Sequence, residues 1–137
     1  MKKINKVISY VLASVTLLSI LVMPCFAAAP STVTPLWDNI LSMDLEISFS
    51  GTAGTAKGTL TKQSDVTSVE GTVTVYRSFA NGWIYVDSES KNTIGNLGIN
   101  VDFTGISGVE YKVVFEATAY RGDVGESHIV TKYATCP

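Results

Sequence analysis

Alternation of apolar and polar residues in short runs is the feature that most constrains how this chain folds. Residues 44–50 alternate cleanly, and residues 97–103 and 111–119 repeat the pattern. A period of two places one set of side chains on each face of a β-strand. No stretch beyond residue 40 carries a clean 3.6-residue apolar period. The chain is therefore predicted to be all-β.

Short segments, most of which contain glycine, separate the predicted strands from one another. The predicted strands cover residues 44–50, 55–61, 66–78, 83–90, 97–103, 111–119 and 128–134. About seven short strands at this spacing predict a single antiparallel β-sandwich or a β-barrel. We expect residues 44–135 to form this domain and residues 30–43 to form an N-terminal linker or a first strand.

Residues 1–29 have the composition of a signal peptide. Three lysines precede an apolar run over residues 7–23, Pro24 ends that run, and small residues over 27–29 offer a cleavage site. A membrane anchor is the alternative, but a run of 17 residues, interrupted by serine and threonine, lies at the lower limit for crossing a bilayer. Proline and alanines directly after the run favour cleavage. We expect a secreted, extracellular protein.

Cleavage changes the charge of the chain. The full sequence has 10 basic and 12 acidic residues. Lys2, Lys3 and Lys6 leave with the signal, so 7 basic residues remain against 12 acidic ones, a net charge of −5. This sign disfavours nucleic acid and anionic membrane surfaces as partners of the mature protein.

Cleavage also removes Cys25 and leaves Cys136 as the single thiol. An internal disulfide is then excluded. Cys136 lies one residue from the C-terminus, where chains are usually frayed. An incidental thiol on a loose tail is the favoured interpretation. A disulfide dimer through Cys136 is the alternative.

The sequence lacks a nucleophile motif for a serine–histidine–acid triad and the ligands for a zinc site, and its many acids single out no catalytic carboxylate pair. His128 is the single histidine, and no Gly-x-Ser-x-Gly motif presents a nucleophile for it. Zinc needs more His and Cys ligands than one of each. The acid pairs Asp44/Glu46 and Asp87/Glu89 offer oxygen ligands for calcium, but a solvated strand face is the favoured interpretation. We expect no enzymatic activity, no cofactor and no metal site.

Asn81-Gly82 is the strongest hairpin signal in the chain, and its geometry decides where Trp83 points. A two-residue turn there pairs Ala80 with Trp83 and turns the tryptophan outward. A three-residue loop with a bulge pairs Phe79 with Trp83 and buries the tryptophan. The buried orientation is the commoner outcome and is favoured. The outward alternative predicts a ligand-binding face made of four residues, Tyr76, Trp83, Tyr85 and Asp87.

Tyr111 lies three residues after Gly108, at the start of the longest predicted strand. Immunoglobulin-like sandwiches often place a tyrosine there, and its hydroxyl forms a hydrogen bond with the backbone a few residues earlier in the chain. Val113 replaces the cysteine of antibody domains. Together with residues 37–40, 82–86 and 108–113, this resembles the small secreted β-sandwich proteins of Gram-positive gut bacteria, a group of unknown function. The resemblance implies a single immunoglobulin-like antiparallel β-sandwich of about seven strands and export of the protein, and it implies no activity.

These observations lead to two functional hypotheses. The favoured one is a secreted, non-catalytic interaction module that binds an extracellular protein, glycan or surface through strand faces and loops. The alternative is a small secreted effector, such as a bacteriocin-like antagonistic protein. The net charge of −5 disfavours a cationic, membrane-lytic form of the effector.

Overall fold

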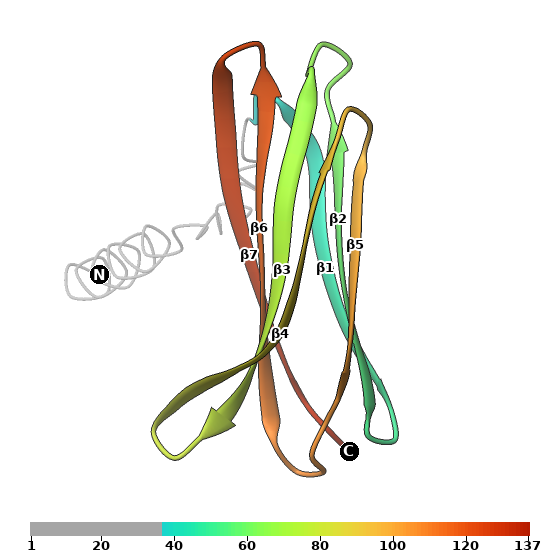
Figure 1. The fold of residues 1–137 in the computed structure, drawn as a ribbon, viewed down its shortest axis with the longest axis vertical. Coiled ribbons are helices and arrows are strands. Elements are labelled where there is room, and N and C mark those ends of the chain that lie inside the picture. The colour runs from blue at the N-terminus through green and yellow to red at the C-terminus, as the bar shows by residue number, and fades with distance from the viewer. Residues whose placement is uncertain (1–36) are drawn as a thin grey trace, which may run out of the picture. The chain divides into compact units, whose positions relative to one another are not determined.

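The computed structural model describes residues 37–137, which form seven β-strands (Figure 1). The strands are β1 (Ile40–Ser50), β2 (Ala53–Lys62), β3 (Ser68–Phe79), β4 (Gly82–Thr93), β5 (Leu97–Thr104), β6 (Glu110–Arg121) and β7 (Val124–Thr135). The all-β prediction is confirmed. The predicted signal peptide over residues 1–29 lies outside the described residues, as do residues 30–36.

The strands form two antiparallel sheets. One has the order β1-β2-β5 and the other the order β4-β3-β6-β7 (Figure 1). The neighbours β3, β6 and β7 correspond to strands C, F and G of an immunoglobulin-like domain, and β1, β2 and β5 correspond to A, B and E. The predicted immunoglobulin-like β-sandwich is therefore confirmed.

The first strand begins earlier than the sandwich boundary expected at residue 44. β1 starts at Ile40, which is 2% exposed, and Asn39 before it is 4% exposed. The pairing of β1 with β2 is irregular between Ile40 and Ser42. An irregularity of this kind breaks the alternation of inward and outward side chains. The start of the strand therefore has no period-two signal in the sequence.

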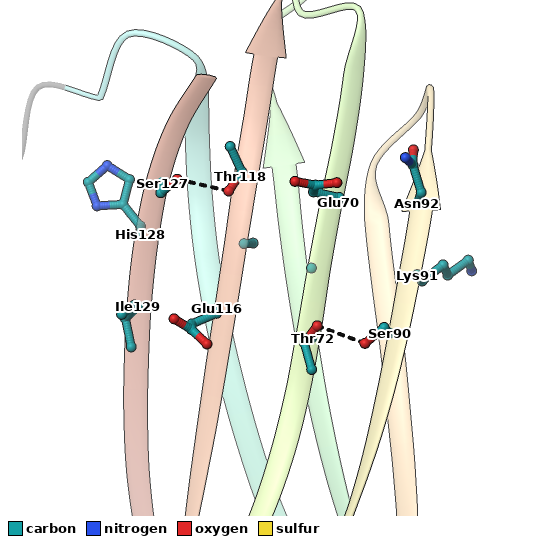
Figure 2. A pocket seen from close by; sticks show the side chains of 12 residues that line it. Glu70, Thr72, Ser90, Lys91, Asn92, Glu116, Thr118, Ser127, His128 and Ile129 are labelled. Carbon is teal, nitrogen blue, oxygen red and sulfur yellow. Dashed lines mark hydrogen bonds between the residues drawn. The ribbon is translucent and has the colours of Figure 1, made fainter. Parts of the chain in front are cut away.

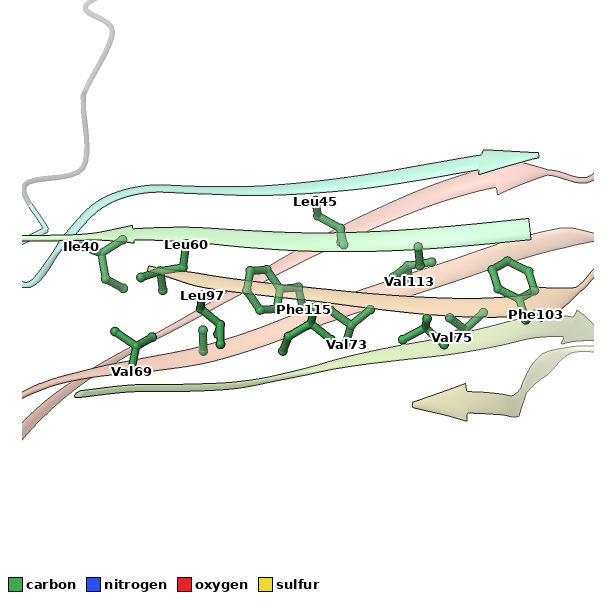
Figure 3. Packing of buried hydrophobic residues seen from close by; sticks show 14 of the residues in the cluster. Ile40, Leu45, Leu60, Val69, Val73, Val75, Leu97, Phe103, Val113 and Phe115 are labelled. Carbon is green, nitrogen blue, oxygen red and sulfur yellow. The ribbon is translucent and has the colours of Figure 1, made fainter. Parts of the chain in front are cut away.

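The core lies between the two sheets and is built from the inward positions of the strands (Figure 3). Val73 on β3 and Phe115 on β6 are fully buried there. Gly58 on β2 faces them, and a Cβ atom on Gly58 would lie 2.7 Å from Val73 Cγ2 and 2.9 Å from Phe115 Cγ. The sheets therefore approach closely at this point because Gly58 has no side chain.

Tyr111 forms the corner that its position in the sequence predicted. Its hydroxyl oxygen accepts a hydrogen bond from the backbone N–H of Ile106 at 2.9 Å. The tyrosine is 1% exposed. The bond ties the loop between β5 and β6 to the start of β6, as in other immunoglobulin-like sandwiches.

The C-terminal end is packed rather than frayed, so the expectation of a loose tail was wrong. Cys136 is 1% exposed, its N–H donates to the carbonyl of Val109 at 3.0 Å, and its carbonyl accepts from Gly108 N–H at 2.8 Å. These bonds extend the pairing of β6 and β7 by one residue beyond Thr135. A disulfide between two copies of the chain would require this end to open.

Candidate functional site

The β3–β4 hairpin closes one residue earlier than the sequence predicted. Phe79 pairs with Gly82, which leaves Ala80 and Asn81 as the loop. Ala80 has a φ of 51°, and it is the single non-glycine residue with positive φ in the described part of the chain. Positive φ at the first loop position is typical of the mirror-image I′ and II′ turns that close two-residue hairpins. The predicted turn at Asn81-Gly82 was wrong.

A bulge in β4 explains the outward orientation of Trp83. Val75 pairs with Asp87, but the next residue of β3, Tyr76, pairs with Tyr85, so Val86 is an extra residue without a partner. Without the bulge, the register of Val75 and Asp87 would continue to the tip and turn Trp83 toward the core. Because Val86 is an extra residue, the side chains of β4 between the bulge and the turn point to the opposite face from the one that the register of Asp87 would give them.

The favoured prediction of a buried Trp83 was therefore wrong. Trp83 is 37% exposed and Tyr85 is 56% exposed, and both share the outer face of the four-stranded sheet with Tyr76. Asp87 pairs with buried Val75 and so lies on the opposite face of the sheet from the rings. Three of the four predicted site residues come together, and Asp87 does not join them.

Two residues from distant strands complete this group. Lys112 on β6 pairs with Tyr76, and Tyr133 on β7 pairs with Lys112. The ammonium of Lys112 lies 4.7 Å from the ring centre of Tyr76 and 4.9 Å from that of Trp83. The Trp83 and Tyr133 ring centres are 5.7 Å apart, and those of Tyr76 and Tyr85 are 6.4 Å apart. We call Tyr76, Trp83, Tyr85, Lys112 and Tyr133 the aromatic cluster.

Sequence reasoning missed Lys112 and Tyr133. The alternation of residues 111–119 does place Lys112 on the outer face of its strand. Its neighbours across the sheet, however, follow from the register of β3, β6 and β7. That register joins Lys112 to Tyr76, 36 positions earlier, and to Tyr133, 21 positions later, and it cannot be obtained from a local pattern.

A shallow depression of about 520 Å³ lies further along the same outer face (Figure 2). Short hydroxyl side chains line much of it, and they are hydrogen-bonded in pairs across neighbouring strands. Thr72 and Ser90 are 2.8 Å apart, and Thr118 and Ser127 are also 2.8 Å apart. The depression lies on the same sheet face as the aromatic cluster, further along the four strands, and its lining combines hydroxyl, charged and apolar groups.

A hydrogen bond fixes one acid at the far end of this face. The hydroxyl of Tyr120 donates to the carboxylate of Glu70, across β6 and β3. This bond, followed by partial burial and the negative charge of Glu70, raises the pKa of the Tyr120 hydroxyl above its ordinary value. Glu70 also lines the depression, so its carboxylate is a positioned hydrogen-bond acceptor there.

The single histidine belongs to a contact between residues 37–39, which directly precede β1, and β7. His128 Nε2 lies 3.2 Å from Glu126 Oε1, and its ring centre is 4.6 Å from a ring centre of Trp37. Glu126 also accepts the backbone N–H groups of Asn39 at 2.6 Å and Asp38 at 3.3 Å. We call these contacts the N-terminal clasp. They give His128 a role in holding residues 37–39 against the sheet.

The clasp also sets the ionisation of Glu126. Burial by itself raises the pKa of this carboxyl group. The hydrogen bonds from Asn39 N–H, His128 and Asp38 N–H, together with the charge of His128, outweigh burial and lower the pKa below its ordinary value.

Residues 37–137 contain no group of three or more His, Cys, Asp and Glu side chains that is placed to hold a metal ion. In the same part of the chain, no helix has the length and apolar character needed to cross a membrane.

The fold and this face together define an immunoglobulin-like β-sandwich with exposed aromatic side chains on its four-stranded sheet. No protein-family model and no curated protein matches the chain. Among solved structures, it is similar to a β-glucuronidase of Parabacteroides merdae, with 15% identity and a TM-score of 0.47. The similarity covers 70% of this chain and 13% of the enzyme's chain. A likeness of this extent says nothing about a shared activity.

Proposed function

We propose that this protein is an exported, non-catalytic interaction module that binds an extracellular protein or glycan through the aromatic cluster. The exposed rings of Trp83, Tyr85 and Tyr133, gathered on one face of a sheet, carry the proposal. Exposed aromatic side chains that lie together mark interaction sites far more often than scattered apolar residues do.

The scaffold beneath the cluster supports this role. Its residues come from β3, β4, β6 and β7, which are hydrogen-bonded neighbours in one sheet. Tyr76 lies beside Lys112, and Lys112 lies beside Tyr133, on adjacent strands. Side chains on paired strands are held more precisely than side chains on loops. The rings therefore need little ordering when a partner binds, which lowers the entropic cost of association.

The proposal is tested by a pull-down from culture supernatant and cell-wall material with the secreted protein as bait. We expect the wild-type protein to retain a partner that the double variant Trp83→Ala/Tyr133→Ala loses. Phe79→Ala is the matched control, because Phe79 is an aromatic residue, 64% exposed, on the same hairpin but on its opposite face.

The control variant should capture the same partner as the wild type. If the double variant and the wild type capture the same molecules in equal amounts, the aromatic cluster is not the binding site and the proposal fails.

A further inference from the structure

We infer that the ligand of this face is a neutral glycan, a chain of uncharged sugars that stacks on the aromatic cluster and hydrogen-bonds to the hydroxyl side chains beside it. The inference rests on the proposed function, because it names the chemical class that the same face binds. Three features of the face carry it: the tilt of the rings, the neighbouring hydroxyl groups, and the distribution of charge.

The rings are tilted relative to one another. The Trp83 and Tyr133 rings are inclined by 51°, and the Tyr76 and Tyr85 rings by 82°. A sugar ring has apolar C–H faces, whose partial positive charge is attracted to the negative face of an aromatic ring. Inclined rings contact a single chain from more than one side, whereas a flat crystalline surface requires coplanar rings. The cluster therefore suits a soluble chain of sugars.

Short hydroxyl side chains occupy many of the outward positions next to the rings, which they share with Val114, Glu116 and Ile129. The hydroxyl residues are Thr72, Thr74, Ser88, Ser90, Thr118, Ser127 and Thr131, contributed by all four strands of the sheet. Tyr85 connects the cluster to them, because its hydroxyl lies 3.1 Å from Ser88 Oγ. Each hydroxyl both donates and accepts, as the hydroxyls of a sugar do. Serine is depleted in protein–protein interfaces, and serine and threonine are uncommon among their hot spots. The composition of the face therefore favours a glycan over a protein.

Charge on the face favours a neutral chain over a charged one. Lys112 lies among the rings, while Glu110 and Glu116 occupy outward positions on the same strand, about 7 Å and about 13 Å away by strand geometry. An acidic polymer would meet these carboxylates, and a basic one would meet Lys112. In the part of the chain that the structure describes, no ion pair involves Lys112. Its ammonium and both carboxylates remain strong hydrogen-bond partners for sugar hydroxyls.

Titration calorimetry with soluble polysaccharides tests the inference. The neutral probes are hydroxyethylcellulose, galactomannan and arabinoxylan, and carboxymethylcellulose is the charged counterpart of the first. We expect at least one neutral polymer to bind the wild-type protein, with an affinity that changes less than about twofold between about 50 mM and about 500 mM salt, because screening weakens interactions between charges. Trp83→Ala should weaken this binding about tenfold, and Phe79→Ala should leave it unchanged.

The other outcomes overturn the inference in distinguishable ways. Binding of carboxymethylcellulose alone, or binding that high salt abolishes, shows that the ligand is acidic. If all four polymers fail to bind while the pull-down captures a protein through Trp83, the glycan inference is wrong and the proposed function stands. If neither experiment depends on Trp83, both are wrong. Far-ultraviolet circular dichroism of each variant establishes that a loss of binding is not a loss of fold.

Discussion

The ammonium of Lys112 lies 4.9 Å from the ring centre of Trp83, although their strands are not neighbours in the sheet. β3 lies between β4 and β6, so the indole reaches across it from the edge strand. The same lysine lies 4.7 Å from the Tyr76 ring centre on the intervening strand. Cation–π contacts of this kind contribute about 0.5–1 kcal/mol each at exposed sites. They hold the rings in place without burying them.

Replacing Trp83 should affect binding more than stability. Trp83→Ala removes a ring that is 37% exposed, so we expect the free energy of unfolding to fall by about 1–2 kcal/mol. Phe115→Ala, at a fully buried position, should lower it by about 3–5 kcal/mol. Urea denaturation of both variants measures the difference. Equal losses would show that Trp83 belongs to the core.

Cys136 should be protected from thiol reagents in the folded protein. Its Sγ lies against Gly105, where an added Cβ would be 2.7 Å away, and the residue is 1% exposed. In protein that lacks residues 1–29, and with them Cys25, we expect Ellman's reagent to react rapidly in guanidinium chloride and slowly under native conditions. Cys136→Ser should lower the free energy of unfolding by about 1–3 kcal/mol, because it buries a hydroxyl group. Rapid labelling of the native protein would show that the C-terminal end opens freely.

The Tyr111 corner should contribute measurably to stability. Tyr111→Phe keeps the ring and removes the hydroxyl, so the backbone N–H of Ile106 loses its acceptor. We expect the free energy of unfolding to fall by about 1–2 kcal/mol. Tyr85→Phe is a suitable control, because Tyr85 is 56% exposed and water can replace its hydroxyl. The corner has no energetic role if both variants unfold at the same urea concentration.

The N-terminal clasp should make stability depend on pH through Glu126. Its pKa is lower in the folded chain than the ordinary value of 4.5. The unfolded chain therefore takes up this proton first as the pH falls. The resulting stabilisation is complete above the ordinary pKa and is lost as the pH falls through the folded one.

Glu126→Gln should flatten this part of the profile of unfolding free energy against pH, measured by urea denaturation from neutral pH down to about pH 3. Glu89→Gln, which changes an exposed acid on β4, should leave the profile close to that of the wild type. An unchanged profile in Glu126→Gln would show that the ionised carboxylate of Glu126 contributes no stability.

The strands were predictable because their signal is local. Val69, Val73 and Val75 share one parity in the sequence, and all three are fully buried on β3. Tyr111 was likewise identified from its position after Gly108 at the start of a strand. In both cases neighbouring residues carry the pattern, since the faces of a strand alternate within a few residues.

The candidate site was only partly predictable. Tyr76, Trp83 and Tyr85 were named from the hairpin, but Asp87 was assigned to the wrong face. The bulge at Val86 lies between Tyr85 and Asp87. Because of this extra residue, the side chains of Tyr85 and Asp87 lie on opposite faces of the sheet. No feature of the hairpin's amino-acid sequence distinguishes Val86 from a residue that has a partner on β3.

The sequence by itself determined the all-β class, the seven strands and the Tyr111 corner, because alternation and turn residues act over short distances along the chain. Only the tertiary structure decided that Trp83 faces outward, that Lys112 and Tyr133 lie beside it, and that Cys136 is buried. These outcomes depend on the register between strands that are distant in sequence. Register is set by the packing of the whole sandwich, so no local pattern records it.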